Sequence, residues 1–83
     1  MHLETASSDT LLVSGCDKLH NLRAIAADLR RPGVGITVFD RFTGSRDGTL
    51  WYYAALVDLF ARRGHPAVAE LRVSLGELVQ GAR

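Results

Sequence analysis

The residues whose types and spacing could do chemistry gather in one stretch, 14–25, which reads SGCDKLHNLRAI. Within two helical turns it places Asp17, Lys18, His20 and Asn21, and Lys18 is the only lysine of the chain. A carboxylate can bind a metal ion, while an ammonium group and an amide can bind phosphate or sugar oxygens. The stretch is therefore a candidate ligand site.

Two interpretations of this stretch fit the sequence. On a helix, Asp17 and Asn21 are four residues apart and lie about 5–6 Å from each other, at the border of the apolar stripe. They form either a partly solvated polar cluster with local hydrogen bonds, which is common on helices, or a ligand site. His20 does not decide between the two, because a stable metal site needs three or four protein ligands. Neither His2 nor His65 completes such a site by its spacing.

Cysteine and aromatic residues are assigned to packing. Cys16 falls on the apolar stripe and no histidine shares its face, so it is predicted to be a buried small hydrophobe and not a nucleophile. Trp51, Tyr52 and Tyr53 point in directions about 100° apart on a helix, so the three cannot all enter the core. Tyr53 fits the buried stripe, which leaves Trp51 or Tyr52 for the core edge, a groove or a partner. No residue is predicted to be catalytic, and the common phosphate-loop, zinc and serine-nucleophile motifs are absent.

The element that must position Asp17 is a long amphipathic helix. It is predicted to begin at Ser8 or Asp9, with Ser8 as its N-cap and Asp9 adding negative charge to the first turn. It is predicted to end before Pro32, because proline disfavours helical geometry in the residue that precedes it. Apolar residues in steps of three and four define its buried stripe. The predicted stripe comprises Leu12, Cys16, Leu19, Leu22, Ala26 and Leu29.

Three further elements are predicted after this helix. Residues 36–42 have a β-branched start but no second strand to pair with, so a short helix is expected, followed by the loop TGSRDG. The next helix runs from about Thr49 to Arg63, with Gly64 just after its end. Pro66 opens the last helix, and Gly81 lies just past its end. The predicted buried positions are Leu50, Tyr53, Ala54, Val57, Phe60 and Ala61 in the former helix, and Val68, Leu71, Leu75 and Leu78 in the latter.

Composition narrows the class of protein. The 83 residues are one domain at most, and 47% apolar with 23% charged residues is ordinary globular composition. We therefore expect a single all-α domain, residues 1–83, of three main helices and one short helix. The net charge of +1 argues against nucleic acid or an anionic membrane as a partner. One cysteine forms no internal disulfide, and no segment resembles a signal peptide or a membrane span, so a cytoplasmic protein is expected.

Several of these residues together resemble a known family. The stretch LLVSGCDKLHNLRAIAADLR resembles the later part of the HD-domain metal-dependent phosphohydrolases, most closely the bacterial guanosine polyphosphate pyrophosphohydrolases. The resemblance continues through Arg41 and Phe42 and through GSRDGTLWYYAALVDLF, so it covers nearly the whole chain. Cys16 and Phe39 depart from the family, in which alanine and tryptophan are usual there. The residues that match the family's helix pattern are Val13, Asp17, Lys18, Leu19, His20, Asn21 and Arg23.

The resemblance implies roles for three residues. Asp17 would be the last ligand of a divalent metal ion such as manganese, and Lys18 and Asn21 would lie near the phosphate or ribose of a bound nucleotide. The family's other ligands, an upstream histidine and a His-Asp pair, have no counterpart in this chain. Because one carboxylate cannot hold such an ion, the expectation is the C-terminal half of an HD domain, inactive and without metal when alone. The alternative is a non-catalytic helical interaction or dimerisation module derived from the family.

The absence of the upstream HD-domain helices leads us to predict self-association. In a full HD domain the helix that bears Asp17 is central, so part of its apolar surface would lose its cover here. Each exposed leucine forfeits about 1.5–3 kcal/mol relative to burial. A homo-oligomer, most simply a two-fold dimer across the first helix, would cover this surface again. The residues expected to be uncovered are Leu11, Leu12, Leu19 and Ile25.

Overall fold

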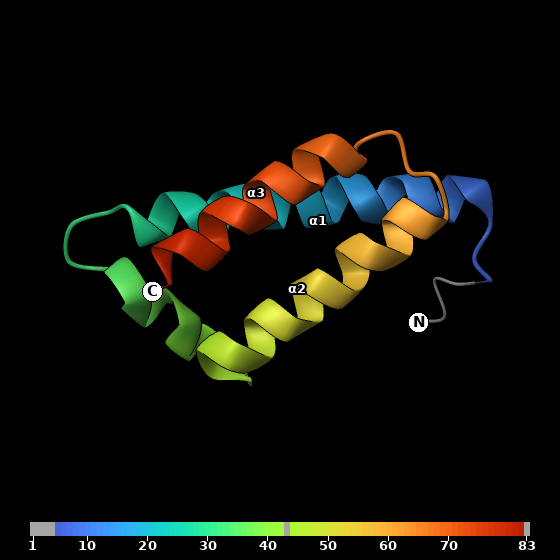
Figure 1. The fold of residues 1–83 in the computed structure, drawn as a ribbon. Coiled ribbons are helices and arrows are strands. Elements are labelled where there is room, and N and C mark those ends of the chain that lie inside the picture. Colours follow the sequence, from blue (N-terminus) through green and yellow to red (C-terminus); the bar gives the residue numbers. More distant parts are fainter. Residues whose placement is uncertain (1–4, 43, 83) are drawn as a thin grey trace.

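A computed structural model describes residues 5–42 and 44–82. These residues form three α-helices and one 3-10 helix (Figure 1). In chain order they are α1 (Ser8–Leu29), η1 (Gly35–Arg41), α2 (Ser45–Arg62) and α3 (Val68–Gly81). The prediction of an all-α fold with three main helices and a short one is confirmed, and the short helix is the segment that could have been read as a strand.

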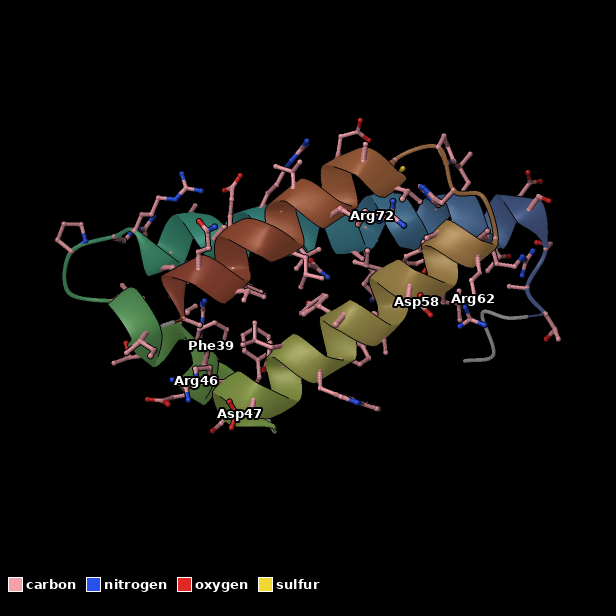
Figure 2. The ribbon with its side chains drawn as sticks, viewed as in Figure 1. Phe39, Arg46, Asp47, Asp58, Arg62 and Arg72 are labelled. Atoms are coloured by element: carbon pink, nitrogen blue, oxygen red, sulfur yellow. The ribbon has the colours of Figure 1, made fainter. Side chains whose placement is uncertain are left out.

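The long helices form an elongated body of 40 × 22 × 17 Å. α1 and α3 run in the same direction and pack along each other, while α2 runs the opposite way and packs on α3 (Figure 1). η1 contacts both α1 and α2 at one end of the body. At that end, Arg46 in the first turn of α2 donates a hydrogen bond of 3.2 Å to the carbonyl of Ala82, just after α3 (Figure 2).

A side-chain cap and a following proline define the two ends of α1. The N-cap is Ser7 and not the predicted Ser8, because the Ser7 side chain accepts a hydrogen bond from the backbone N–H of Thr10, three residues on, at 3.2 Å. Asp9 lies in the first turn as predicted. The helix ends at Leu29, before Pro32, which confirms the predicted stop.

The start of α2 was predicted four residues too late. Ser45 to Gly48 were assigned to a loop because of their turn-forming composition, but they form the first turn of the helix. The hydrogen bond from Arg46 to Ala82 holds this turn, and Asp47 complements the helix dipole. At the other end, Gly64 has φ +72 just after the C-cap, which confirms the predicted stop.

The start of α3 was predicted two residues too early. Pro66 lies in the turn before the helix and does not open it, and the N-cap is Ala67. The backbone N–H of Ala67 donates to His65 Nδ1 at 3.0 Å, and this bond shapes the turn. Gly81, predicted to lie past the helix, is its last residue.

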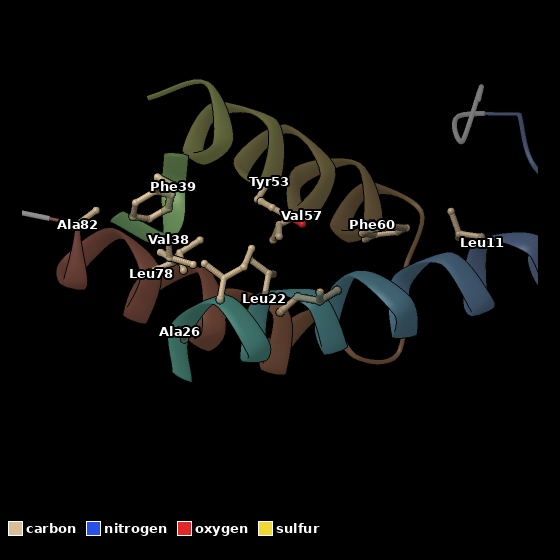
Figure 3. Packing of buried hydrophobic residues seen from close by; sticks show 12 residues of the cluster. Leu11, Leu22, Ala26, Val38, Phe39, Tyr53, Val57, Phe60, Leu78 and Ala82 are labelled. Carbon is tan, nitrogen blue, oxygen red and sulfur yellow. The ribbon is translucent and has the colours of Figure 1, made fainter. Parts of the chain in front are cut away.

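The core lies between the three helices and η1 (Figure 3). In α2 and α3 the predicted stripes contain the buried residues Tyr53, Val57, Phe60, Leu71 and Leu78, whereas Ala54 is exposed. The buried hydrophobic residues of the described chain are Leu11, Leu22, Ile25, Ala26, Val38, Phe39, Tyr53, Val57, Phe60, Leu71, Leu78 and Ala82.

The predicted stripe of α1 was wrong in its first half. Leu12 is 43% exposed and Cys16 is exposed, while Leu11, Ser14 and Gly15 are buried instead. Both sets of positions have helical spacing, so periodicity alone does not choose between them. The buried set is the one that faces His65, whose ring lies against Gly15.

The structure also corrects the prediction that four apolar residues of the first helix would be exposed. Leu11 and Ile25 are 6% and 4% exposed, so the chain's own helices cover them, and Leu19 is half-buried. Of the four residues expected to be uncovered, Leu12 is the one that is exposed. Within the described residues, no helix has the length and apolar character that crossing a membrane requires.

Candidate functional site

The three predicted site residues lie in the middle of α1. The side chain of Asp17 is 62% exposed and that of Lys18 is 21% exposed. Lys18 Nζ lies 3.6 Å from Asp17 Oδ2, and Asn21 is half-buried one turn further along the helix. The aspartate is thus open to solvent, and the lysine lays much of its side chain against the protein.

Asp17 and Asn21 both influence the hydroxyl group of Tyr53 on α2, a residue that is 5% exposed, Asn21 through a hydrogen bond and Asp17 through its charge. Burial raises the pKa of the Tyr53 hydroxyl above its ordinary value, and the nearby charges of Tyr52 and Asp17 raise it further. A hydrogen bond with the Asn21 side chain acts in the opposite direction and lowers it. Two predicted site residues therefore converge on a tyrosine that the sequence assigned to the core alone. We call Asp17, Asn21 and Tyr53 the α1–α2 cluster.

Next to this cluster lies a cavity of about 380 Å³ whose lining includes Asn21, Tyr53, Asp28 and Arg41. Arg41 Nη2 forms an ion pair of 2.7 Å with Asp28 Oδ2, which joins η1 to α1 across the loop between them. The Asp28 side chain is 22% exposed and that of Arg41 is 58% exposed, so the guanidinium keeps access to solvent. The cavity offers an amide, a carboxylate, a guanidinium and a phenol to a polar ligand.

An open region of surface toward the start of α1 also includes Asp17, and all the residues that line it belong to α1. Lys18 and Asp17 line it together with Val13, which is 69% exposed. The predicted metal and phosphate contacts therefore open into a space with an apolar wall. Asp9 also lines this space, so its charge is mixed.

The donor set of the described residues does not fit a complete metal centre. Within residues 5–42 and 44–82, no group of three or more His, Cys, Asp or Glu side chains could hold a metal ion. His20 is exposed on α1, and His2 lies outside the described residues. Asp17 alone supplies too few donors for a divalent ion.

His65 is a structural residue. Its Nδ1 accepts a hydrogen bond from Ala67 N–H at 3.0 Å, so the neutral ring carries its proton on Nε2 and donates it to the carbonyl of Leu12 at 3.1 Å. The ring is 4% exposed and meets Phe60 edge to face, with centroids 5.3 Å apart. Both ring nitrogens are therefore engaged within the fold.

Cys16, Trp51 and Tyr52 are exposed. Cys16 was predicted to be buried, but it lies on the outer side of α1 because the helix turns Gly15 toward His65. Of the aromatic run, Tyr53 is buried as predicted. Trp51 is 73% exposed, and Tyr52 is 45% exposed with its ring edge-on to Tyr53.

Sequence reasoning missed two polar members of the site, Asp28 and Arg41. They are 13 residues apart on different elements, and no helical spacing links them. Arg41 was among the residues on which the sequence resemblance was based, but nothing in the sequence indicated that it pairs with Asp28. No family model, no curated protein and no solved structure matches this sequence.

Proposed function

We propose that this chain supplies one side of an HD-type phosphohydrolase site that binds a nucleotide such as a guanosine polyphosphate. In this proposal Asp17 is one ligand of a divalent metal ion, and Lys18 and Asn21 contact phosphate or ribose. The proposed metal and nucleotide roles are those that the sequence resemblance to HD-domain phosphohydrolases implies. The observation that carries the proposal is the α1–α2 cluster, in which the exposed Asp17 and the half-buried Asn21 lie one turn apart on α1 and Asn21 lines the cavity beside Tyr53.

The charges around the cluster suit a phosphorylated ligand. Lys18 stands on one side of Asp17, and Arg41 lies in the cavity next to Asn21. Arg41 is positioned by its 2.7 Å ion pair with Asp28, whereas Lys18 makes only a weak contact of 3.6 Å with the exposed Asp17. A phosphate would gain charge-assisted hydrogen bonds from both cations.

The chain is proposed to be inactive alone. Hydrolysis in this family depends on a metal ion, and the described donors do not complete its site. The further ligands would come from outside the described residues. No reaction step is therefore assigned to these side chains, whose proposed work is to bind and orient a nucleotide.

Calorimetric titration of the whole chain with guanosine tetraphosphate tests the nucleotide site. We expect Lys18→Ala to weaken binding at least about tenfold, since a hydrogen bond to a charged group contributes about 1.5–3 kcal/mol. Arg72→Ala, which removes an exposed arginine of α3, is the matched control and should leave the affinity unchanged (Figure 2). Equal affinity of wild type and Lys18→Ala would refute the site.

A turnover assay with manganese tests the second half of the proposal. We expect no hydrolysis of guanosine tetraphosphate by the chain alone. Hydrolysis that disappears in Asp17→Ala would show that the chain assembles a complete active site, and the half-site proposal would then be wrong.

A second candidate function is a helical self-association module. The observation in its favour is the apolar exposure of α1, where Leu12 is 43% and Val13 is 69% exposed. Covering such side chains on a second copy would be favourable. A molar mass of one chain at all concentrations in light scattering would exclude this candidate.

A further inference from the structure

α1 and α3 enclose a groove of about 440 Å³ whose two rims carry opposite charge. Arg23 and Arg30 stand on the α1 rim, and Glu70 and Glu77 stand on the α3 rim. All four residues are exposed. Arg30 and Glu77 form an ion pair across the groove, and their side chains, 69% and 47% exposed, both keep access to solvent.

The charges of the two rims are in register. Arg23 precedes Arg30 by seven residues, and Glu70 precedes Glu77 by the same number. Seven residues are about two helical turns, so the two arginines lie on one side of α1 and the two glutamates lie on one side of α3. Because α1 and α3 run in the same direction and Arg30 meets Glu77, the other two charges also lie at a common level (Figure 1).

Small and apolar residues lie between the charged levels. Ala27 lies between the arginines of α1, and Val73 lies between the glutamates of α3 and is 62% exposed. Ala69 also lines the groove, so the backbone of a partner could approach closely. The groove is thus an unpartnered face with an apolar centre and charged ends.

We infer that this groove is the contact surface for a second copy of the chain, related by a two-fold axis that runs along the groove. Rotation about such an axis places α1 of each copy over α3 of the other and keeps their direction and level. Both arginines of each copy then face both glutamates of the other, and Val73 lies against the partner copy's α1 near the level of Ala27. The interface is self-complementary, as a two-fold contact must be.

The same charges exclude the other simple arrangement. A two-fold axis across the helices would place α1 over α1 and α3 over α3, with arginine against arginine and glutamate against glutamate. Like charges opposite each other suppress that pairing. The charges on the two rims therefore favour the dimer in which α1 of each copy lies over α3 of the other. This inference is independent of the phosphohydrolase proposal. It deepens the self-association candidate but places the contact on the α1–α3 groove, whose lining does not include Leu12 or Val13.

A charge-exchange experiment on the whole chain tests the surface. One variant, Glu70→Lys with Glu77→Lys, has two basic rims, and a second, Arg23→Glu with Arg30→Glu, has two acidic rims. In light scattering and sedimentation at low salt, we expect the wild type to form dimers and each variant alone to lose at least about tenfold in affinity. An equimolar mixture of the two variants should form dimers again, because each basic rim then meets an acidic one.

The matched control reverses two acidic residues of α2 that lie outside the groove, Asp47→Lys with Asp58→Lys (Figure 2). Their side chains are 89% and 70% exposed, and the net charge changes as in the first variant. The control should dimerise like the wild type, and circular dichroism of all variants establishes that they fold. A monomeric wild type would refute self-association and this surface together. Dimers that persist in both groove variants would refute this surface and leave self-association standing.

Discussion

The imidazole of His65 lies so close to Gly15 that a Cβ atom built on the glycine would be 2.1 Å from His65 Nε2. The two residues are 50 positions apart in the sequence. α1 can pack this closely against the turn between α2 and α3 only because Gly15 has no side chain. His65 cannot move away easily, since it is buried and hydrogen-bonded through both ring nitrogens. This contact fixes which side of α1 faces the core.

Gly15→Ala is therefore expected to destabilise the protein, although alanine favours helix. The added methyl group meets three ring atoms within 2.7 Å, and overpacking of this kind costs about 1–3 kcal/mol. Thermal unfolding followed by circular dichroism measures the change. Gly76→Ala in α3 is the control, because nothing lies within 4 Å of its Cβ, and it should gain up to about 1 kcal/mol from helix propensity. Equal stabilisation by both substitutions would contradict the contact.

A double-mutant cycle with His65→Ala isolates the same contact. Once the ring is absent, the methyl group of Gly15→Ala has room, so its cost should disappear. We expect a coupling free energy of about 1–3 kcal/mol between the two positions. Additive effects in urea unfolding would show that the two residues do not meet.

Thr49→Val is expected to stabilise the protein. Thr49 is 4% exposed, and among the described residues its Oγ1 has no hydrogen-bond partner. Burying an unpaired hydroxyl costs about 1–3 kcal/mol, and valine keeps the shape without that group. The midpoint of thermal unfolding should rise by about 4–8 °C for each kcal/mol gained. Thr49→Ser keeps the hydroxyl and should give no such rise, and a loss of stability in Thr49→Val would contradict the prediction.

The pKa of Tyr53 can be read in a Tyr52→Phe variant, which leaves it as the single tyrosine. Burial is the largest cause of the raised pKa and persists in this variant, so the phenolate absorbance should rise only above the ordinary value of about 10. In urea the transition should return to the ordinary value. A folded-state transition at or below that value would contradict the burial of the hydroxyl.

The same shift predicts how stability depends on pH. Above the unfolded pKa of about 10, the unfolded chain loses the tyrosine proton while the folded protein keeps it, so this group's contribution to stability falls as pH rises. Below that pH the contribution is fully present. In Tyr53→Phe this part of the alkaline decline should be absent, which urea unfolding at a series of pH values would measure.

Asp17→Asn should leave stability almost unchanged, within about 0.5 kcal/mol. The carboxylate is largely solvated, and its pair with Lys18 at 3.6 Å is an exposed one of small energy. Chemical unfolding checks this directly. A loss of several kcal/mol would mean that Asp17 holds the fold together, and its proposed role toward a ligand would lose its basis.

The helical class, the number of elements and the stops of α1 and α2 follow from the sequence by itself, whereas the starts of α2 and α3 do not. Steps of three and four indicate the helices, and Pro32 and Gly64 follow the ends of two of them. The lack of a partner strand favours a short helix at residues 36–42, and the structure has it at Gly35–Arg41. These features depend on neighbours in the chain, which a sequence displays. The aspartate–asparagine pair at positions 17 and 21 is visible for the same reason.

Which side of α1 is buried was decided by the tertiary structure. The stripes through Leu11 and through Leu12 both have helical spacing, and the choice depends on His65, which arrives from the α2–α3 turn. The Asp28–Arg41 pair and the influence of Asp17 and Asn21 on Tyr53 likewise link separate elements. Such contacts depend on the packing of distant segments, and hydrophobic periodicity within one segment carries no information about them.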